Sequence, residues 1–332
     1  MFKALAEQNP DHEHIALLQC LYKHQRGIIG DHSFPITRGV RQGDVLSPIL
    51  FNAVLEHAME RWKQVLTDEG FVLSPDLAQP RLTNIRYADD LLLFGKSLSE
   101  AVDMLEKLAT ISKSYGLEPN MKKTKIISPE HPSENTQVCI TDFGPVDVLG
   151  VQDRHKYLGR LFTGDLKTRG KSAIDHRLSC GWMKFKAFQH VFEDKQVSVK
   201  LRFKLFDSIV SSTILYGLDT ARLTAAMLHR IDVTQRTMLR RIVGWVCYSD
   251  DSWGDNGRRM ANRLRRCLEL HPLKDWSEMI NERKAKMIEN ESEWPYWTKS
   301  AVKWSPVECA RLNFHFPYRV VGHPHQRWND NI

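Results

Sequence analysis

Two adjacent aspartates interrupt a run of strand-forming residues in RYADDLLLFG, residues 86–95. Like charges do not normally lie side by side within a strand, so Asp89 and Asp90 predict a sharp bend between two strands. Aspartate favours turns because its side chain bonds nearby backbone groups. Mg²⁺, in turn, is typically held by one or two carboxylates together with substrate phosphates. The pattern is therefore compatible with a solvated turn and with a metal-binding hairpin tip.

The charge of the chain favours a polyanionic partner. The 332 residues, enough for about two domains, carry a formal net charge of +7. Residues 171–241 alone contain 13 Lys or Arg against 6 Asp or Glu, a difference of +7. A second basic cluster, RRMANRLRR, occupies residues 258–266. Such an excess of cations is typical of nucleic-acid contacts, although an ordinary solvated basic face has the same composition.

Cysteine usage and hydropathy bear on the cellular compartment. The chain has 6 cysteines, and they form no C-x-x-C pair, which argues against a disulfide framework or a zinc knuckle. The first residues lack the apolar segment of a signal peptide, and no run of 18 apolar residues occurs. We expect an intracellular protein, nuclear or cytoplasmic, that is neither secreted nor bound to a membrane.

The predicted elements alternate between helices and short strands. Helices are expected over residues 1–24, from Ser47 as N-cap followed by Pro48, and from a capping box formed by Ser97 and Glu100. Gly116 is a natural stop for the third helix. The remaining stretches read as follows: 27–44 loop and strand, 67–81 loop, 117–165 short strands and turns, and beyond 171 mainly helix. This order favours an α+β class.

A turn of sequence Arg41-Gln42-Gly43 precedes the helix that starts near Ser47. Glycine-bearing turns at helix N-termini suit phosphates and nucleotides. For this stretch by itself, however, a plain junction between a loop and a helix is the favoured interpretation.

The combination of these motifs is more specific than any one of them. RGVRQGDVLSPILFNAVLE, ending at Glu56, followed by RYADD resembles the reverse transcriptase domain of non-LTR (LINE-type) retrotransposons. GLEPNMKKTKII at 116–127 and HKYLGRLF at 155–162 follow in the order of that family. The closing GHPHQRWNDNI also resembles the end of many such reading frames. The resemblance is strongest from 34 to 160 and loose beyond 245.

This resemblance implies a partial right-hand polymerase. Its palm, an antiparallel sheet packed on helices, would occupy residues 1–150, and a primer-grip hairpin residues 151–170. A basic helical thumb would cover residues 171–245, and residues 246–332 would form a C-terminal extension whose role the sequence does not define.

The resemblance also implies the catalytic residues. Asp89 and Asp90 would be the metal-binding carboxylates, and Lys123, in the N-x-x-K-T arrangement with Asn120, would lie near the leaving pyrophosphate. A solvated lysine is the alternative interpretation of Lys123. Two Mg²⁺ ions are expected in the complete enzyme. The residues implied to bind nucleotide, template and primer end are Arg41, Gln42, Gly43, Tyr87 and Ala88.

Two further groups of residues are implied to contact the nucleic acid. The primer grip would be Tyr157, Leu158 and Gly159, for which a strand-ending turn is the alternative. The thumb would hold the duplex backbone through Lys200, Arg202 and Lys204. The expected partners are an RNA template, a DNA primer and deoxynucleoside triphosphates.

In this family another aspartate, on an earlier palm strand, bridges the metal ions. The N-terminal stretch of this chain resembles the sequence just after that strand, and neither Asp11 nor Asp31 has the expected context. We therefore expect that the chain alone does not polymerise DNA and needs a missing N-terminal segment or a partner chain. A non-catalytic nucleic-acid-binding remnant and a pseudogene product are the alternatives.

Overall fold

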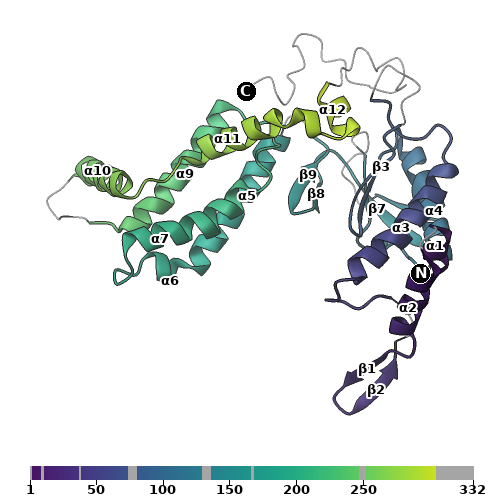
Figure 1. Cartoon of the computed structure of the whole chain (residues 1–332). Helices are drawn as coiled ribbons and strands as arrows, with labels where there is room; N and C mark the ends of the chain where they lie inside the picture. Colours follow the sequence, from purple (N-terminus) through teal and green to yellow (C-terminus); the bar gives the residue numbers. More distant parts are fainter. Residues whose placement is uncertain are drawn as a thin grey trace, which may run out of the picture. The chain divides into compact units, whose positions relative to one another are not determined.

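A computed structural model describes residues 2–8, 11–36, 39–73, 81–128, 136–165, 168–246, 248 and 252–303. The chain divides into two compact units at Leu149 and Gly150. We call them the N-terminal unit and the C-terminal unit, and each is described by itself (Figure 1). The closing GHPHQRWNDNI stretch lies outside the described residues.

The N-terminal unit mixes helices with short strands. Its elements are α1 (Phe2–Glu7), α2 (His12–Tyr22), β1 (Arg26–Ile29), β2 (His32–Pro35), α3 (Ser47–Gln64), β3 (Asn84–Tyr87), β4 (Asp90–Leu93), α4 (Leu98–Ser114), β5 (Lys125–Ile127), β6 (Thr136–Ile140) and β7 (Gly144–Leu149).

The strands of this unit form three small sheets. β1 pairs with β2 and β3 pairs with β4, both antiparallel. The third sheet has the order β5-β7-β6, and β5 runs parallel to β7 while β6 runs antiparallel to it. The sheets are therefore mostly antiparallel, as the sequence predicts, with one parallel pair that it does not predict.

The single helix expected over residues 1–24 is wrong, because the structure has two helices there. α2 begins after Asp11, whose carboxylate accepts a hydrogen bond from the backbone N–H of Glu13 at 3.1 Å. That bond satisfies a free backbone donor at the start of α2, so a second helix begins after Asp11.

The expected N-cap role of Ser47 is also wrong. Ser47 is the first residue of α3, and its hydroxyl is buried without a hydrogen-bond partner. Asp44 instead accepts a hydrogen bond from the backbone N–H of Leu46 at 3.1 Å. The aspartate, one turn earlier, competes successfully for the free donors at this end.

The capping box of α4 is confirmed in part. Ser97 accepts a hydrogen bond from the N–H of Glu100 at 3.2 Å, and Gly116 follows the helix with φ +76°. The Glu100 carboxylate accepts from Lys96 at 3.0 Å and from Gly70 at 2.7 Å. Glu100 therefore connects α4 to the segment that follows α3.

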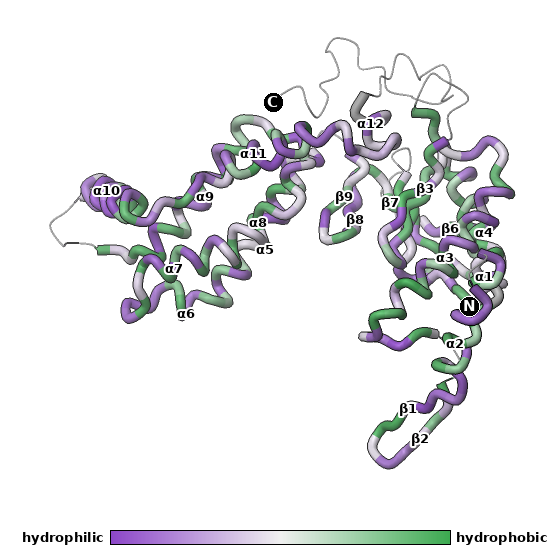
Figure 2. The backbone as a smooth tube through the Cα atoms, in the orientation of Figure 1, coloured by the Kyte–Doolittle hydropathy of each residue, from purple (hydrophilic) through white to green (hydrophobic). Residues whose placement is uncertain are grey.

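Two apolar clusters hold this unit together. The first joins α3 to α4 around Trp62, whose indole N–H donates to the carbonyl oxygen of Met104 at 3.0 Å. The second joins α4 to the three-stranded sheet through Leu105, Ile126, Ile140, Val146 and Val148. The β1–β2 hairpin projects from its unit and carries some hydrophobic residues (Figure 2). Ile28 and Ile29 of β1 are 74% and 71% exposed.

The C-terminal unit is mainly helical. Its elements are β8 (Arg154–Tyr157), β9 (Arg160–Thr163), α5 (Arg169–Ala187), α6 (Gln189–Phe192), α7 (Val199–Phe206), a π-helical turn (Asp207–Ser211), α8 (Ser212–Leu215), α9 (Ala225–Val243), α10 (Trp253–Leu270), α11 (Trp276–Glu289), a 3₁₀ turn (Glu291–Glu293) and α12 (Tyr296–Lys303).

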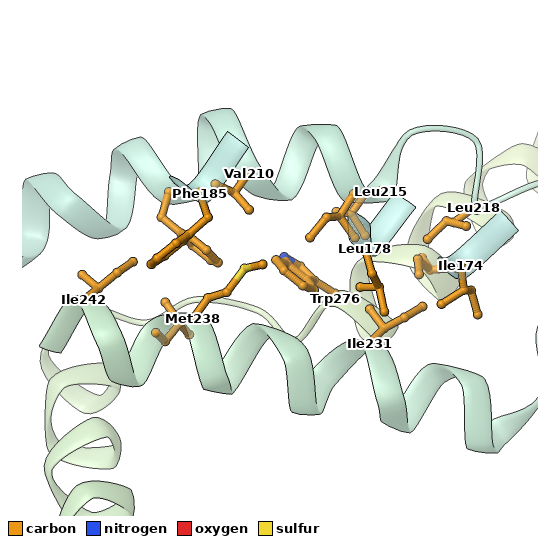
Figure 3. Packing of buried hydrophobic residues seen from close by; sticks show 14 of the residues in the cluster. Ile174, Leu178, Phe185, Val210, Leu215, Leu218, Ile231, Met238, Ile242 and Trp276 are labelled. Atoms are coloured by element: carbon orange, nitrogen blue, oxygen red, sulfur yellow. The ribbon is translucent and has the colours of Figure 1, made fainter. Parts of the chain in front are cut away.

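One large hydrophobic cluster forms the core of this unit. Trp276 of α11 is fully buried among side chains from α5, α8 and α9 (Figure 3). Its indole N–H donates to the Ser211 hydroxyl at 2.8 Å, which satisfies the one polar atom of that side chain. Among the described residues, no helix combines the length and apolar character needed to cross a membrane.

Candidate active site

Asp89 lies at the tip of the β3–β4 hairpin. Tyr87 and Asp90 are the last paired residues, so Ala88 and Asp89 form a two-residue turn. Ala88 has φ +52°, and Asp89 has no positive φ, which matches the φ signature of a type II′ hairpin turn. Tyr87, Ala88, Asp89 and Asp90 are all exposed. The predicted bend is confirmed, and it presents both carboxylates to the outside.

The base of the hairpin is fixed by α3 and α4. Leu91 and Leu93 of β4 pack against the cluster that joins these two helices. Arg86 of β3 forms an ion pair with Glu56 of α3. Apolar contacts and one ion pair thus hold the strands in place, while the aspartates remain at the surface.

The Arg41-Gln42-Gly43 turn leads into α3 and is exposed. Gly43 has φ +90°, a left-handed conformation that favours glycine. The turn is closed by a hydrogen bond from the N–H of Asp44 to the carbonyl oxygen of Arg41 at 3.3 Å. α3 therefore connects the glutamine-bearing turn at its start to the hairpin that contacts Glu56.

Lys123 lies in a turn that precedes β5, and its residue is exposed. The side-chain oxygen of Asn120 accepts from the N–H of Lys123 at 3.3 Å, and its carbonyl accepts from the N–H of Thr124 at 2.9 Å. The N-x-x-K-T arrangement is thus a turn organised by Asn120 that leaves the Lys123 side chain at the surface.

The C-terminal unit contains the second predicted hairpin. Tyr157 pairs with Arg160, and the turn between them is Leu158-Gly159. Leu158 has φ +46° and Gly159 has φ +74°. Two positive φ values in a row are the signature of a type I′ turn. The predicted turn is present at the predicted residues.

Arg residues crowd around this hairpin. Burial lowers the pKa of Arg160; Asp219 opposes that shift, and the neighbouring positive charge of Arg177 adds to it. Burial and then the charge of Arg160 also lower the pKa of Arg169. Of these side chains, Arg177 bonds the carbonyl oxygen of Gly159 in the turn, and Arg169 bonds that of Thr163 at the far end of β9.

The three cations predicted on the thumb do not share one face. Lys200 and Lys204 of α7 are exposed, whereas Arg202 is 6% exposed. The Arg202 guanidinium donates to the carbonyl oxygen of Phe192 at 3.1 Å and to that of Ile242. The prediction for Arg202 needs correction, because its guanidinium is used inside the unit and faces no external phosphate.

The donor chemistry at the hairpin tip fits magnesium. Carboxylate oxygens are the hard ligands that Mg²⁺ prefers, and two of them suffice when a nucleotide supplies phosphate oxygens. Within the described ranges, no group of three or more His, Cys, Asp or Glu side chains is arranged to hold a metal ion. The two carboxylates at this tip are those of Asp89 and Asp90.

Comparison with known proteins gives the class. The family model for reverse transcriptase (RNA-dependent DNA polymerase) matches residues 3–161, a range that includes the Ala88-Asp89 turn and the Leu158-Gly159 turn. This matched stretch, a little under half of the chain, carries a reverse transcriptase domain. This confirms the family that the motifs predict.

The relatives place the domain with those of non-LTR retrotransposons. A transposon-derived protein of Caenorhabditis elegans is 26% identical over 256 residues, which cover 76% of this chain and 84% of that protein. The Pol polyprotein of a type-1 R2 retrotransposable element of Popillia japonica is 30% identical over 214 residues, or 62% of this chain and 28% of the polyprotein. The chain thus spans less than a third of that polyprotein.

Sequence reasoning missed Glu56, Arg86, Arg177 and Tyr216. Glu56 and Arg86 lie within the recognised motifs, but their pairing joins a helix to a strand 30 positions away. Arg177 and Tyr216 hold the second hairpin through contacts described below. No local pattern distinguishes such residues from other charged or aromatic side chains.

Proposed function

We propose that the N-terminal unit is the palm of an RNA-directed DNA polymerase whose metal-binding carboxylates are Asp89 and Asp90. The observation that carries this proposal is the exposed pair of carboxylates on a tight turn whose base is packed against α3 and α4. The packed strands fix the two neighbouring carboxylates in position, where they can bind a metal ion. Phosphoryl transfer asks a protein mainly for this kind of positioning and charge neutralisation.

When bound, two Mg²⁺ ions would activate the primer 3′-hydroxyl and stabilise the leaving oxygens. The chain's own residues would orient the substrates. Gln42 and Gly43 would lie against the incoming nucleotide and the template, with Arg41 beside them. Tyr87 would support the primer end, and Ala88 would leave room for it.

Lys123 would add a positive charge near the leaving pyrophosphate. Lys123 is exposed on a turn that Asn120 organises, and this position supports the role. Its side chain already lies at the surface, where a phosphate can approach it.

We propose further that a third carboxylate completes the metal site. Two unit charges 4 Å apart interact by about 4 kcal/mol at an effective dielectric near 20, so two divalent ions repel by roughly 16 kcal/mol. Asp89, Asp90 and substrate phosphates offset part of that repulsion. A carboxylate that bridges both ions would offset more and would also fix their separation.

In the C-terminal unit, the turn at Tyr157–Gly159 would contact the primer strand, and Lys200 and Lys204 would contact phosphates of the duplex. The exposure of both lysines on one side of α7 supports the latter role. Contacts of this kind are independent of sequence and sensitive to salt, as template copying requires.

Primer extension on an RNA template with Mg²⁺ tests the catalytic proposal. The assay compares the 332-residue chain with a form that carries an added upstream aspartate-bearing strand. We expect synthesis only from the extended form, and we expect Asp89→Asn to abolish it. Robust Asp89-dependent synthesis by the 332-residue chain would support the polymerase assignment and contradict the need for an added carboxylate.

A non-catalytic nucleic-acid-binding protein is the second candidate, favoured by the basic character of residues 171–241. In that case Asp89→Ala leaves binding to an RNA–DNA duplex unchanged. Lys200→Ala and Lys204→Ala should each reduce the slope of log affinity against log salt by about 0.9. Lys286→Ala, an exposed lysine of α11, is the matched control. Binding that does not respond to salt would exclude this candidate.

A further inference from the structure

The turn of the β8–β9 hairpin is held by two side chains from other elements. Tyr216, just after α8, donates from its hydroxyl to the carbonyl oxygen of Leu158 at 3.0 Å. Arg177 of α5 donates from its guanidinium to the carbonyl oxygen of Gly159. Each of the two turn residues therefore has its carbonyl bound by one side chain.

The two holding side chains also contact each other. The Arg177 guanidinium lies 4.6 Å from the centre of the Tyr216 ring, within the range of a cation–π contact. A Cβ added to Gly159 would lie 3.4 Å from the Tyr216 ring and 3.7 Å from Arg177. The turn is thus in close contact with both side chains.

The backbone of the turn needs such support. Leu158 has φ +46°, a left-handed conformation that a branched side chain rarely adopts. Strained backbone persists where the surrounding structure over-determines it, and such positions cluster at functional sites. The Tyr216 hydroxyl bonds the carbonyl of this same residue.

The strand after the turn, β9, is held by the loop that follows α8 and carries Tyr216. Arg160 donates to the Thr220 hydroxyl. A Cβ on Gly217 would lie 3.1 Å from the Arg160 side chain, so the loop and the strand approach closely. The loop is anchored by Leu215 and Leu218, which are buried in the main cluster of the unit.

Arg177, the other side chain that holds the turn, is anchored in the core as well. Arg177 is 9% exposed, and its helical neighbours Ile174 and Leu178 belong to the same hydrophobic cluster. Both holding side chains therefore lie next to residues of the hydrophobic cluster, and they connect that core to the turn.

We propose that Arg177 and Tyr216 are positioning residues, which fix the Leu158–Gly159 turn and thereby the strand end that this turn contacts. The inference rests on the proposed function, which assigns this turn to the primer. Neither residue needs to touch the primer itself, because each acts through a carbonyl group of the turn.

Photo-cross-linking of a primer on an RNA template tests this role in the full chain. The primer carries 4-thiothymidine either at its 3′ end or five nucleotides from the end, and cross-linked peptides are mapped. Tyr216→Phe removes the hydroxyl and keeps the ring against Arg177. Tyr248→Phe is the matched control, since Tyr248 is exposed and its ring also carries a guanidinium, that of Arg259 at 4.3 Å.

We expect the wild-type chain to cross-link residues 155–163 from the 3′-terminal base. In Tyr216→Phe that product should fall roughly fivefold, the effect of losing one hydrogen bond, relative to the internal position. Duplex affinity, measured by fluorescence anisotropy, should change less than about twofold, and Tyr248→Phe should match the wild type. Arg177→Lys, which keeps the charge and loses the planar fork, should shift the ratio in the same direction.

Three results would overturn the inference in different ways. An unchanged ratio in Tyr216→Phe refutes the positioning role and leaves the primer assignment of the turn standing. An equal loss at both positions shows a general structural role only. A wild-type chain that never cross-links residues 155–163 refutes the primer assignment of the turn, and the positioning role with it, while metal binding at Asp89 is tested separately.

Discussion

The guanidinium of Arg86 pairs with the carboxylate of Glu56, and this ion pair joins β3 to α3. The pair is partly exposed, with 24% of the Arg86 side chain and 45% of the Glu56 side chain accessible, so its contribution is modest. It lies on the strand that leads directly into the Ala88-Asp89 turn. The position of the two aspartates therefore depends on a contact between a strand and the helix that follows the glutamine-bearing turn.

Glu56→Gln should loosen the β3–β4 hairpin. Loss of an ion pair worth about 0.5–1 kcal/mol predicts amide hydrogen exchange roughly two- to fivefold faster across residues 84–93. Glu60→Gln, an exposed position one turn further along α3, is the control and should leave these rates unchanged. Equal rates in both variants would show that Leu91 and Leu93 alone hold the hairpin.

Ala88→Gly should stabilise the chain. Ala88 has φ +52°, a conformation that costs a non-glycine residue about 1–2 kcal/mol, partly offset by the greater freedom of glycine in the unfolded chain. The expected net gain is about 0.5 kcal/mol in urea unfolding. Ala16→Gly, on an exposed position of α2, should instead cost about 1 kcal/mol. If the free energy of unfolding changed in the same direction in both variants, the conclusion that the turn is strained would be contradicted.

Arg202→Ala should destabilise the C-terminal unit by about 2–4 kcal/mol, because it leaves buried carbonyl groups of Phe192 and Ile242 without a donor. Lys204→Ala, on the exposed side of the same helix, should change the free energy of unfolding by less than about 0.5 kcal/mol. Urea unfolding followed by circular dichroism measures both. If Arg202→Ala and Lys204→Ala were equally stable, the structural role of Arg202 would be refuted and its predicted contact with the duplex backbone would stand.

Acid should destabilise the N-terminal unit through Glu69. Burial by itself would raise the pKa of Glu69, but hydrogen bonds from Lys107 and from the backbone of Thr67, Glu69 and Asp68 lower it from 4.5 to about 2. A carboxyl whose pKa is lower in the folded state stabilises the fold above its unfolded value, and that contribution is lost as the pH falls from about 4.5 towards 2.

The comparison of wild type with Glu69→Gln measures this contribution. The difference in unfolding free energy should be on the order of 1 kcal/mol at pH 6 and should shrink towards pH 2. Glu118→Gln, an exposed glutamate in the loop after α4, should show no such trend. A difference between wild type and Glu69→Gln that is constant with pH would contradict the assignment.

The sequence predicts the two hairpin turns well because their signals are local. Asp89 and Gly159 lie at turns that the neighbouring residues already require. The helix starts are predicted less well, since Asp44 and Ser47 compete for the same free backbone donors and only the structure shows that Asp44 bonds one of them.

The error at Arg202 has a periodic origin. Successive helical residues are about 100° apart, so Arg202 lies roughly 200° from Lys200 while Lys204 lies roughly 40° from it. Arg202 therefore shares the face of the buried Phe206, a conclusion that helical spacing supports as soon as α7 is recognised. The Arg177 and Tyr216 contacts have no such local signal, because they join residues 18 and 58 positions apart.

Binding of Mn²⁺ with a deoxynucleoside triphosphate, followed by water-proton relaxation, tests the role of the Asp89 hairpin most directly. Asp89→Asn should weaken formation of the ternary complex roughly tenfold or more, since a carboxylate–cation contact near a protein surface is worth several kcal/mol. Asp142→Asn, at the exposed β6–β7 turn with φ +64°, should bind as the wild type does. Equal loss in both variants, or no loss in Asp89→Asn, would contradict a metal-binding role for this hairpin.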